Sequence, residues 1–64
     1  MNANEAAKFI RDARKRLNMT QPQFASALGV TKRTIIYWEQ GEYAPDTRTI
    51  LAIKLMMRMA EEVT

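Results

Sequence analysis

Apolar residues recur along this chain with the 3.6-residue period of an α-helix rather than the strict alternation of a β-strand. In the first such stretch they fall on one face, three or four residues apart: Ala6, Phe9, Ile10, Ala13 and Leu17. The spacing predicts a helix over about Asn4–Leu17. Asn2 with Glu5 three residues later is a capping pair for its start, and Asn4 is an alternative cap.

Two short helices are predicted next, each bracketed by a start and a stop. Thr20 followed by Gln23 three residues later is a capping box for the first of them. Gly29 ends that helix, because glycine accepts the left-handed backbone conformation of a C-terminal stop without strain. The next helix starts only two residues later, with Thr31 as its N-cap, and Gly41 ends it in the same way.

A fourth helix is predicted from the cap Asp46 to about Glu62, with apolar residues over well over half of its circumference. The narrow polar stripe consists of Lys54, Arg58 and Glu61. A helix packed on one face needs an apolar stripe only slightly wider than ~100°, so a second apolar face is left over. We expect this surplus to contact a second copy or another protein, unless the bundle wraps the helix on two sides. The expected contact residues are Met56, Met59 and Val63.

Composition limits how so short a chain can be stabilised and what it can catalyse. Its 64 residues make a single domain, 1–64, and domains of this size bury only about 60% of their unfolded surface. Cysteine and histidine are absent, which removes disulfides, the usual zinc ligands, the commonest general base and the thiol nucleophile. The sequence has no paired carboxylates and no Gly-rich phosphate loop. We therefore expect no enzymatic activity, no metal and no cofactor.

Positive charge is concentrated in the first two thirds of the chain. Residues 1–40 carry seven basic and three acidic side chains, whereas residues 41–64 carry three and four. This layout is expected of one phosphate-facing surface, although so modest a net charge can also serve solubility alone. No stretch approaches the ~18 apolar residues of a membrane span, and the N-terminus lacks the regions of a signal peptide. We expect a cytoplasmic protein without membrane contact.

The most informative segment is 21–40, where two short helices flank a glycine-containing turn, which is the plan of a helix-turn-helix. Ala25 is small enough for the two helix axes to approach closely, and Gly29 tolerates the positive φ of a sharp turn. Five apolar residues fill the space between these helices and the first one: Phe24, Leu28, Val30, Ile35 and Trp38. All seven positions have the residue type that the motif needs.

The stretch from 17 to 31, then 35–41 and Pro45, resembles the phage repressor/Cro (XRE-type) helix-turn-helix family. The resemblance spans about residues 9–55, and its most distinctive part is the Trp-Glu-x-Gly-x-x-x-Pro segment at 38–45. It implies an all-α, lambda-repressor-like bundle of four or five helices that binds operator DNA, usually as a dimer.

The resemblance also implies that the helix over 31–40 lies in the major groove, with its first residues at base edges. Lys32 and Arg33 can donate to guanine O6 and N7, and Thr34 can meet a thymine methyl or a base edge. Gln21 is expected to bridge a phosphate and the recognition helix. The expected DNA contacts are Thr20, Gln21, Thr31, Lys32, Arg33, Thr34, Tyr37 and Gln40.

Four residues in or near the motif need separate explanations. By the resemblance, Arg14 and Glu39 form a partly buried ion pair that ties the first helix to the recognition helix. Arg14 can also contact a phosphate directly, and both roles are compatible. Tyr37 either reaches a phosphate or base or is a partly buried surface aromatic. Glu42 replaces the basic residues that the family often has, which leaves the loop its backbone N–H groups for phosphate contact.

Together these features predict a sequence-specific transcriptional regulator, repressor- or Cro-like, that binds palindromic double-stranded DNA as a homodimer. One alternative is an antitoxin that represses its own toxin–antitoxin operon, with the fourth helix docked on the toxin. Another is a protein-interaction module that kept the fold and lost DNA binding. Lys32 and Arg33 at groove-facing positions argue against the module.

Overall fold

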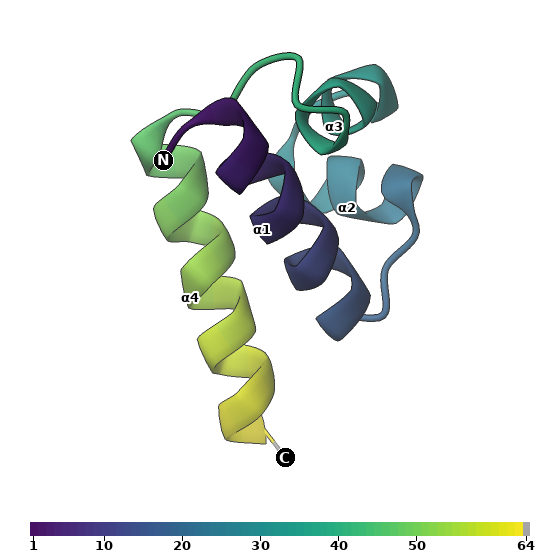
Figure 1. The fold of residues 1–64 in the computed structure, drawn as a ribbon. Coiled ribbons are helices and arrows are strands. Elements are labelled where there is room, and N and C mark those ends of the chain that lie inside the picture. The colour runs from purple at the N-terminus through teal and green to yellow at the C-terminus, as the bar shows by residue number, and fades with distance from the viewer. Residues whose placement is uncertain (64) are drawn as a thin grey trace.

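The computed structural model describes residues 1–63, with Val63 described by its backbone only. The described chain folds into four helices: α1 (Ala3–Arg16), α2 (Gln21–Leu28), α3 (Lys32–Glu39) and α4 (Thr47–Val63). Figure 1 shows α2 and α3 packed on one side of α1, and α4 running along its other side. The prediction of an all-α bundle is confirmed with four helices, and no fifth helix forms within residues 1–63.

The first two helices begin at the side-chain caps that the sequence predicts. Asn2 Oδ1 accepts the Glu5 backbone N–H at 2.8 Å, and Asn2 Nδ2 donates to Glu5 Oε1 at 2.8 Å, so Asn2 rather than Asn4 is the cap. Thr20 Oγ1 accepts the Gln23 N–H at 3.2 Å, while Gln23 Oε1 accepts the Thr20 N–H at 2.9 Å. Both capping pairs therefore satisfy backbone N–H groups that have no partner within the helix.

Each of the first three helices is followed within two residues by a residue with a left-handed backbone. The φ angle of this residue is 55° at Asn18, 72° at Gly29 and 77° at Gly41. After each, the next N–H donates to a carbonyl five residues back, as in the 2.9 Å bond from Val30 to Ala25. Both glycine stops were predicted. The stop at Asn18 was not, because asparagine enters this conformation less readily than glycine and gives a weaker sequence signal.

The core lies between α1, α2 and α3, and α4 adds one fully buried side chain to it. The large side chains with 0% exposure come one from each helix: Ile10, Phe24, Ile35 and Ile53. Trp38 and Ala25 are buried beside them, and Leu28 and Val30 pack against the cluster. Each fully buried large apolar side chain contributes about 1.5–3 kcal/mol, so the apolar positions of the motif hold the helices together.

Helix α4 is packed on one face and exposed on the other. Ile53 is buried, and Met56 and Met57 lie half-buried against the core. On the opposite face, Leu51 is 58% exposed, and Leu55 and Met59 are each 56% exposed. The bundle therefore does not wrap α4 on two sides. Within residues 1–63, none of the helices combines the length and apolarity that crossing a membrane requires.

Candidate nucleic-acid interface

The start of α3 presents an exposed polar surface on a helix whose other side is anchored. Thr31, Lys32 and Arg33 are exposed, and Thr34 is half-exposed. The neighbouring Ile35 is fully buried in the core. Because α3 is only two turns long, its buried and exposed residues are closely interleaved. The groove-facing residues expected from the sequence therefore share one accessible end of the helix.

The two threonines at this end bind each other. Thr31 Oγ1 accepts the Thr34 backbone N–H at 3.2 Å and lies 3.1 Å from Thr34 Oγ1, where either hydroxyl can donate. The Thr31 side chain is thus engaged as the N-cap of α3. A base contact by Thr34 would start from a hydroxyl that is already oriented by its neighbour.

The start of α2 is linked directly to the end of α3. Thr20 is exposed, and its hydroxyl is engaged in the capping box. Gln21 is half-exposed, and its Nε2 donates to Glu39 Oε1 at 3.2 Å. This bond supplies the link between Gln21 and the recognition helix. The capping box already engages the Thr20 and Gln23 N–H groups and Pro22 has none, so the Gln21 N–H and the positive end of the helix dipole are what the start of α2 offers a phosphate.

The carboxylate of Glu39 is the centre of a buried polar network. Arg14 Nε donates to Glu39 Oε2 at 2.7 Å, and Arg14 Nη2 donates to Oε1 at 3.2 Å, which is a two-pronged contact. The Glu39 side chain is 7% exposed and that of Arg14 is 17% exposed. Arg14 Nη1 also donates to the Met19 carbonyl at 3.1 Å. All three nitrogens of Arg14 therefore have an acceptor within the protein, which favours its structural role over direct phosphate contact.

A second arginine of α1 binds the same residue through its backbone. Arg11 Nη1 donates to the Glu39 carbonyl oxygen at 2.6 Å. This carbonyl belongs to the last turn of α3, where acceptors have no partner within the helix and the helix dipole favours a positive charge. The apolar periodicity of α1 leaves Arg11 outside its buried stripe and gives no sign of this contact. Its spacing of three residues from Arg14, on neighbouring parts of one helix surface, was the available signal.

An aromatic pair holds the loop after α3 against the helix. The ring centroids of Tyr37 and Tyr43 are 5.7 Å apart, with the ring planes tilted by 53°. Tyr37 is half-exposed, whereas Tyr43 is 47% exposed. Edge-tilted pairs at this separation are favourable for aromatic rings. Gln40, the other expected contact at this end, is exposed as the C-cap of α3.

The two described methionines expected at a protein contact differ in exposure. Met56 is half-buried against the core, and Met59 is exposed on the outer face of α4. The side chain of Val63 lies outside the described residues. The residues that share the outer face with Met59 are Leu51 and Leu55, which a pattern that is apolar on most sides does not single out.

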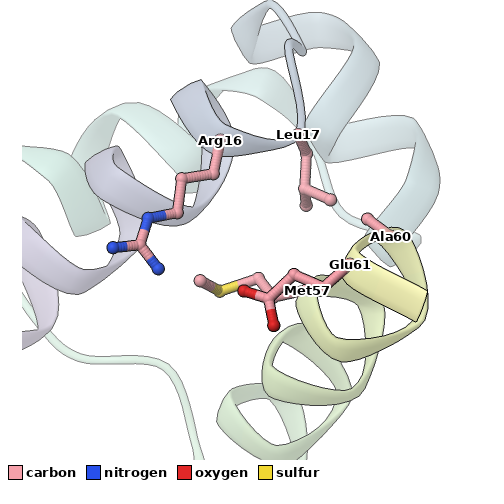
Figure 2. Close-up of a pocket in the computed structure, with 5 residues that line it drawn as sticks. All are labelled: Arg16, Leu17, Met57, Ala60 and Glu61. Atoms are coloured by element: carbon pink, nitrogen blue, oxygen red, sulfur yellow. The ribbon is translucent and has the colours of Figure 1, made fainter. Parts of the chain in front are cut away.

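A shallow cavity of about 230 Å³ lies between the end of α1 and the second half of α4. In Figure 2, Arg16 and Leu17 line one side of it, and Met57, Ala60 and Glu61 line the other. Across residues 1–63, acidic side chains form no group that could hold a metal ion. The cavity lies away from the exposed start of α3 and adds nothing to the surface that would meet DNA.

A helix-turn-helix family model matches residues 10–53. The chain belongs to the XRE-type helix-turn-helix family. The matched segment begins at Ile10 and ends at Ile53, and both side chains are fully buried. The helix-turn-helix family match thus spans the seven residues of the buried core cluster and ends within α4, before the half-buried Met56 and Met57. The second half of α4, from Lys54 onward, is not described by the family.

Relatives at the sequence level include a methyltransferase, a transcriptional regulator and an antitoxin. The type II methyltransferase M.SsoII of Shigella sonnei is 46% identical over 50 residues, which cover 73% of this chain and 13% of the methyltransferase. An uncharacterized HTH-type transcriptional regulator of Methanothermobacter thermautotrophicus is 42% identical over 54 residues, covering 84% and 75% of the two chains. Antitoxin HigA-2 of Vibrio cholerae is 33% identical over 51 residues, covering 80% and 49%.

The coverage limits what each of these relatives says about this chain. This chain spans 13% of the methyltransferase's length. The similarity to the methyltransferase therefore concerns the helix-turn-helix region alone. The Methanothermobacter regulator is matched over 75% of its length, so that similarity covers most of both chains. No solved structure matches the chain at a significant level.

Proposed function

We propose that this protein is a sequence-specific DNA-binding transcriptional regulator that inserts the start of α3 into the major groove. The observation that carries the proposal is the pair of exposed cations, Lys32 and Arg33, in the first turn of a helix whose inner side is anchored. Membership of the XRE-type family supports the same role. We assign it no catalytic activity, and we place it in the cytoplasm with the DNA that it binds.

The polar network on Glu39 explains how α3 holds a fixed orientation on the DNA. Arg14 and Gln21 bind its carboxylate, and Arg11 binds its carbonyl, so α1 and α2 both restrain the end of α3. Base contacts need such restraint, because a displacement of about 0.5 Å already disturbs a hydrogen-bonded site. With Lys32 or Arg33 on guanine, a good two-pronged contact gives about 1–3 kcal/mol of discrimination between bases.

Phosphate contacts would position this helix without reading sequence. We propose that the Gln21 N–H, with the side chains of Thr20 and Gln21, contacts one phosphate, and that Gln40 and Tyr37 contact the backbone beyond α3. Thr31 and Thr34 complete the surface at the start of the recognition helix. Two copies would then occupy paired half-sites of a palindromic operator, about one helical turn apart, as two-fold symmetric helix-turn-helix proteins do.

Selection of bound fragments from random DNA, at a stated salt concentration, tests the proposal directly. We expect a palindromic consensus, and no enrichment at all would contradict sequence-specific binding. The variant Lys32→Ala/Arg33→Ala should lose affinity for one half-site and relax its base preference, by about 1–3 kcal/mol for each lost guanine contact. Lys54→Ala/Arg58→Ala removes the same charge from α4 and is the matched control. An equal loss in both variants would assign the effect to net charge rather than to α3.

A second candidate is an antitoxin that represses its own operon while α4 binds the toxin. The relative named antitoxin HigA-2 and the exposed apolar face of α4 favour it. Co-expression with the product of the neighbouring gene tests this role: suppression of that product's toxicity supports it, and no complex between the two proteins contradicts it. A protein-interaction module without DNA binding would give no enrichment in the selection above.

A further inference from the structure

The exposed face of α4 carries an apolar stripe that the fold leaves uncovered. Leu51, Leu55 and Met59 are spaced four residues apart, and each is more than half exposed. Residues at this spacing lie next to one another along one side of a helix. The stripe is on the side of α4 opposite the buried Ile53. In Figure 1, α4 is separated from α3 by α1, so the stripe does not compete with the surface proposed for DNA.

Opposite charges flank the two ends of this stripe. Arg48 precedes Leu51 by three residues, and Glu62 follows Met59 by three, so both fall on the same face. Both side chains are exposed, and the Arg14–Glu39 salt bridge involves neither of them. Each charge also has the sign that opposes the helix dipole at its end of α4. The charge of Arg48 favours the ionised form of the Asp46 cap, but the dipole of α4 disfavours both end charges, which points to a further use for the pair.

The face has the symmetry of a surface that fits its own copy. Counted from Leu55, Leu51 and Met59 are each four residues away, and Arg48 and Glu62 are each seven residues away. A two-fold axis through Leu55 therefore places Leu51 of each copy opposite Met59 of the other. It also places Arg48 of each copy opposite Glu62 of the other. Such self-complementarity is the requirement for a closed, two-fold symmetric contact.

We propose that two copies of the protein pack their α4 helices antiparallel on this face, with Leu55 on the two-fold axis. Leu51 then meets the partner's Met59, and Arg48 meets the partner's Glu62. This contact rests on the proposed function in so far as it joins two copies for paired half-sites. It differs from the sequence-based expectation, which placed the contact at Met56, Met59 and Val63.

A groove beside the stripe can receive the partner's side chain. It has a volume of about 270 Å³ and is lined by Leu51, Lys54, Leu55 and Arg58. The aliphatic parts of Lys54 and Arg58 can cover apolar surface while their charges stay in water. The two-fold axis brings these cations of both copies to the same edge, which weakens the contact. A small apolar face with this repulsion makes a weak dimer, strengthened when both copies are held on adjacent half-sites.

Cysteine scanning tests the position of the axis, because the chain has no cysteine of its own. Leu55→Cys places two thiols across the axis, so oxidation without DNA should give a disulfide-linked dimer on a non-reducing gel. Leu51→Cys is equally exposed but faces the partner's Met59, so alone it should cross-link far less, whereas Leu51→Cys/Met59→Cys should cross-link well. Equal cross-linking of the two single variants would overturn the proposed axis.

Charge reversal tests the pairing of the ends. Arg48→Glu and Glu62→Arg should each weaken self-association about tenfold, since symmetry affects two ion pairs at once. The double reversal should restore it. Both single changes favour the dipole of α4, but Arg48→Glu also puts a carboxylate near the Asp46 cap, so circular dichroism of each variant should check that α4 stays folded. Analytical ultracentrifugation without DNA measures the effect. A strict monomer at high micromolar concentration, or a double variant weaker than either single one, would overturn the contact.

Binding to a single half-site separates this inference from the proposed function. All of these α4 variants should bind one half-site with the affinity of the unchanged protein, because the contact lies away from α3. If the protein stays monomeric yet binds half-sites, the α4 contact is overturned and the DNA-binding role stands. If it dimerises through Leu55 but enriches no DNA, the contact stands and the proposed function is overturned.

Discussion

Helices α3 and α4 pack on the same core through different kinds of interaction. Helix α3 is held by buried apolar side chains and by hydrogen bonds from α1 and α2 to Glu39. Helix α4 is held mainly along α1 by Ile53 and half-buried methionines, and Asp46 caps its start. Hydrogen bonds are directional and therefore fix the rotation of a helix about its axis. Apolar contacts are non-directional, so they hold a helix in place but restrain its rotation less. The helix proposed to read bases has the directional restraint.

Loss of the Glu39 carboxylate should have the largest effect, because it removes that restraint and leaves a charge unpaired. Glu39→Ala deprives Arg14 of its counter-ion and Gln21 of its acceptor. We expect about 3–5 kcal/mol of lost stability, and thus a melting temperature lower by more than about 10 °C.

Glu39→Gln keeps the shape and one acceptor, and it should remain folded with a smaller loss. Thermal unfolding followed by circular dichroism measures both variants. A melting temperature lowered by less than about one degree in Glu39→Ala would contradict the role of the network in holding α3.

The two faces of α4 should differ sharply in their contribution to stability. Ile53 is fully buried, so Ile53→Ala should cost about 2–4 kcal/mol through lost contacts and a cavity. Leu55 is exposed, and Leu55→Ala should stay within about 0.5 kcal/mol at concentrations where the protein is monomeric. Urea unfolding gives both values. Similar losses for the two variants would show that the outer face is already covered within one copy.

The helix stops on either side of α3 allow a finer comparison. Gly29 and Gly41 both have positive φ, so an alanine at either position should cost about 1–2 kcal/mol. A Cβ at Gly41 would also lie 3.2 Å from Asn4 Oδ1, whereas a Cβ at Gly29 meets nothing within 4 Å. We therefore expect Gly41→Ala to be the more damaging of the two in urea unfolding. Asn4→Ala in the Gly41→Ala background should recover the difference, and no recovery would exclude the contact.

The caps of the two helices should differ in their response to pH, with the smallest effect of the series. Helix α3 starts at the neutral Thr31, whereas Asp46 Oδ1 accepts the Thr49 N–H at 2.8 Å at the start of α4. Hydrogen bonds from the Thr49 side chain and backbone, with the charge of Arg48, hold the pKa of Asp46 below its ordinary value.

Because the pKa of Asp46 is lower in the folded chain, the unfolded chain takes up the proton first as pH falls. The contribution of Asp46 is complete above its ordinary pKa and is lost as pH falls through the lowered one. Asp46→Asn keeps a capping acceptor but does not titrate. The stability difference between Asp46 and Asp46→Asn, from urea unfolding, should therefore shrink through this acidic range. A difference that stays constant would contradict the role of the charge.

The local order of this molecule was predictable because its causes are local. The capping pairs at Asn2 and Thr20 and the stops at Gly29 and Gly41 act within a few residues, so they can be identified from sequence alone. The spacing of the apolar residues predicted the helix-turn-helix, and the resemblance over 17–45 pointed to the family that the helix-turn-helix model then matched. The stop at Asn18 was missed because asparagine adopts the required conformation only some of the time.

The sequence by itself determined the helices, the motif and the family. The tertiary structure decided which partners the polar side chains meet and which face of α4 stays exposed. Arg11 and Gln21 meet Glu39 across 28 and 18 residues of chain, and no local rule specifies such pairs. Helix α4 is apolar on most sides, so its periodicity leaves several faces equivalent. Packing against α1 buries Ile53 and leaves Leu55 exposed, because only one face of a helix can lie against a single neighbour.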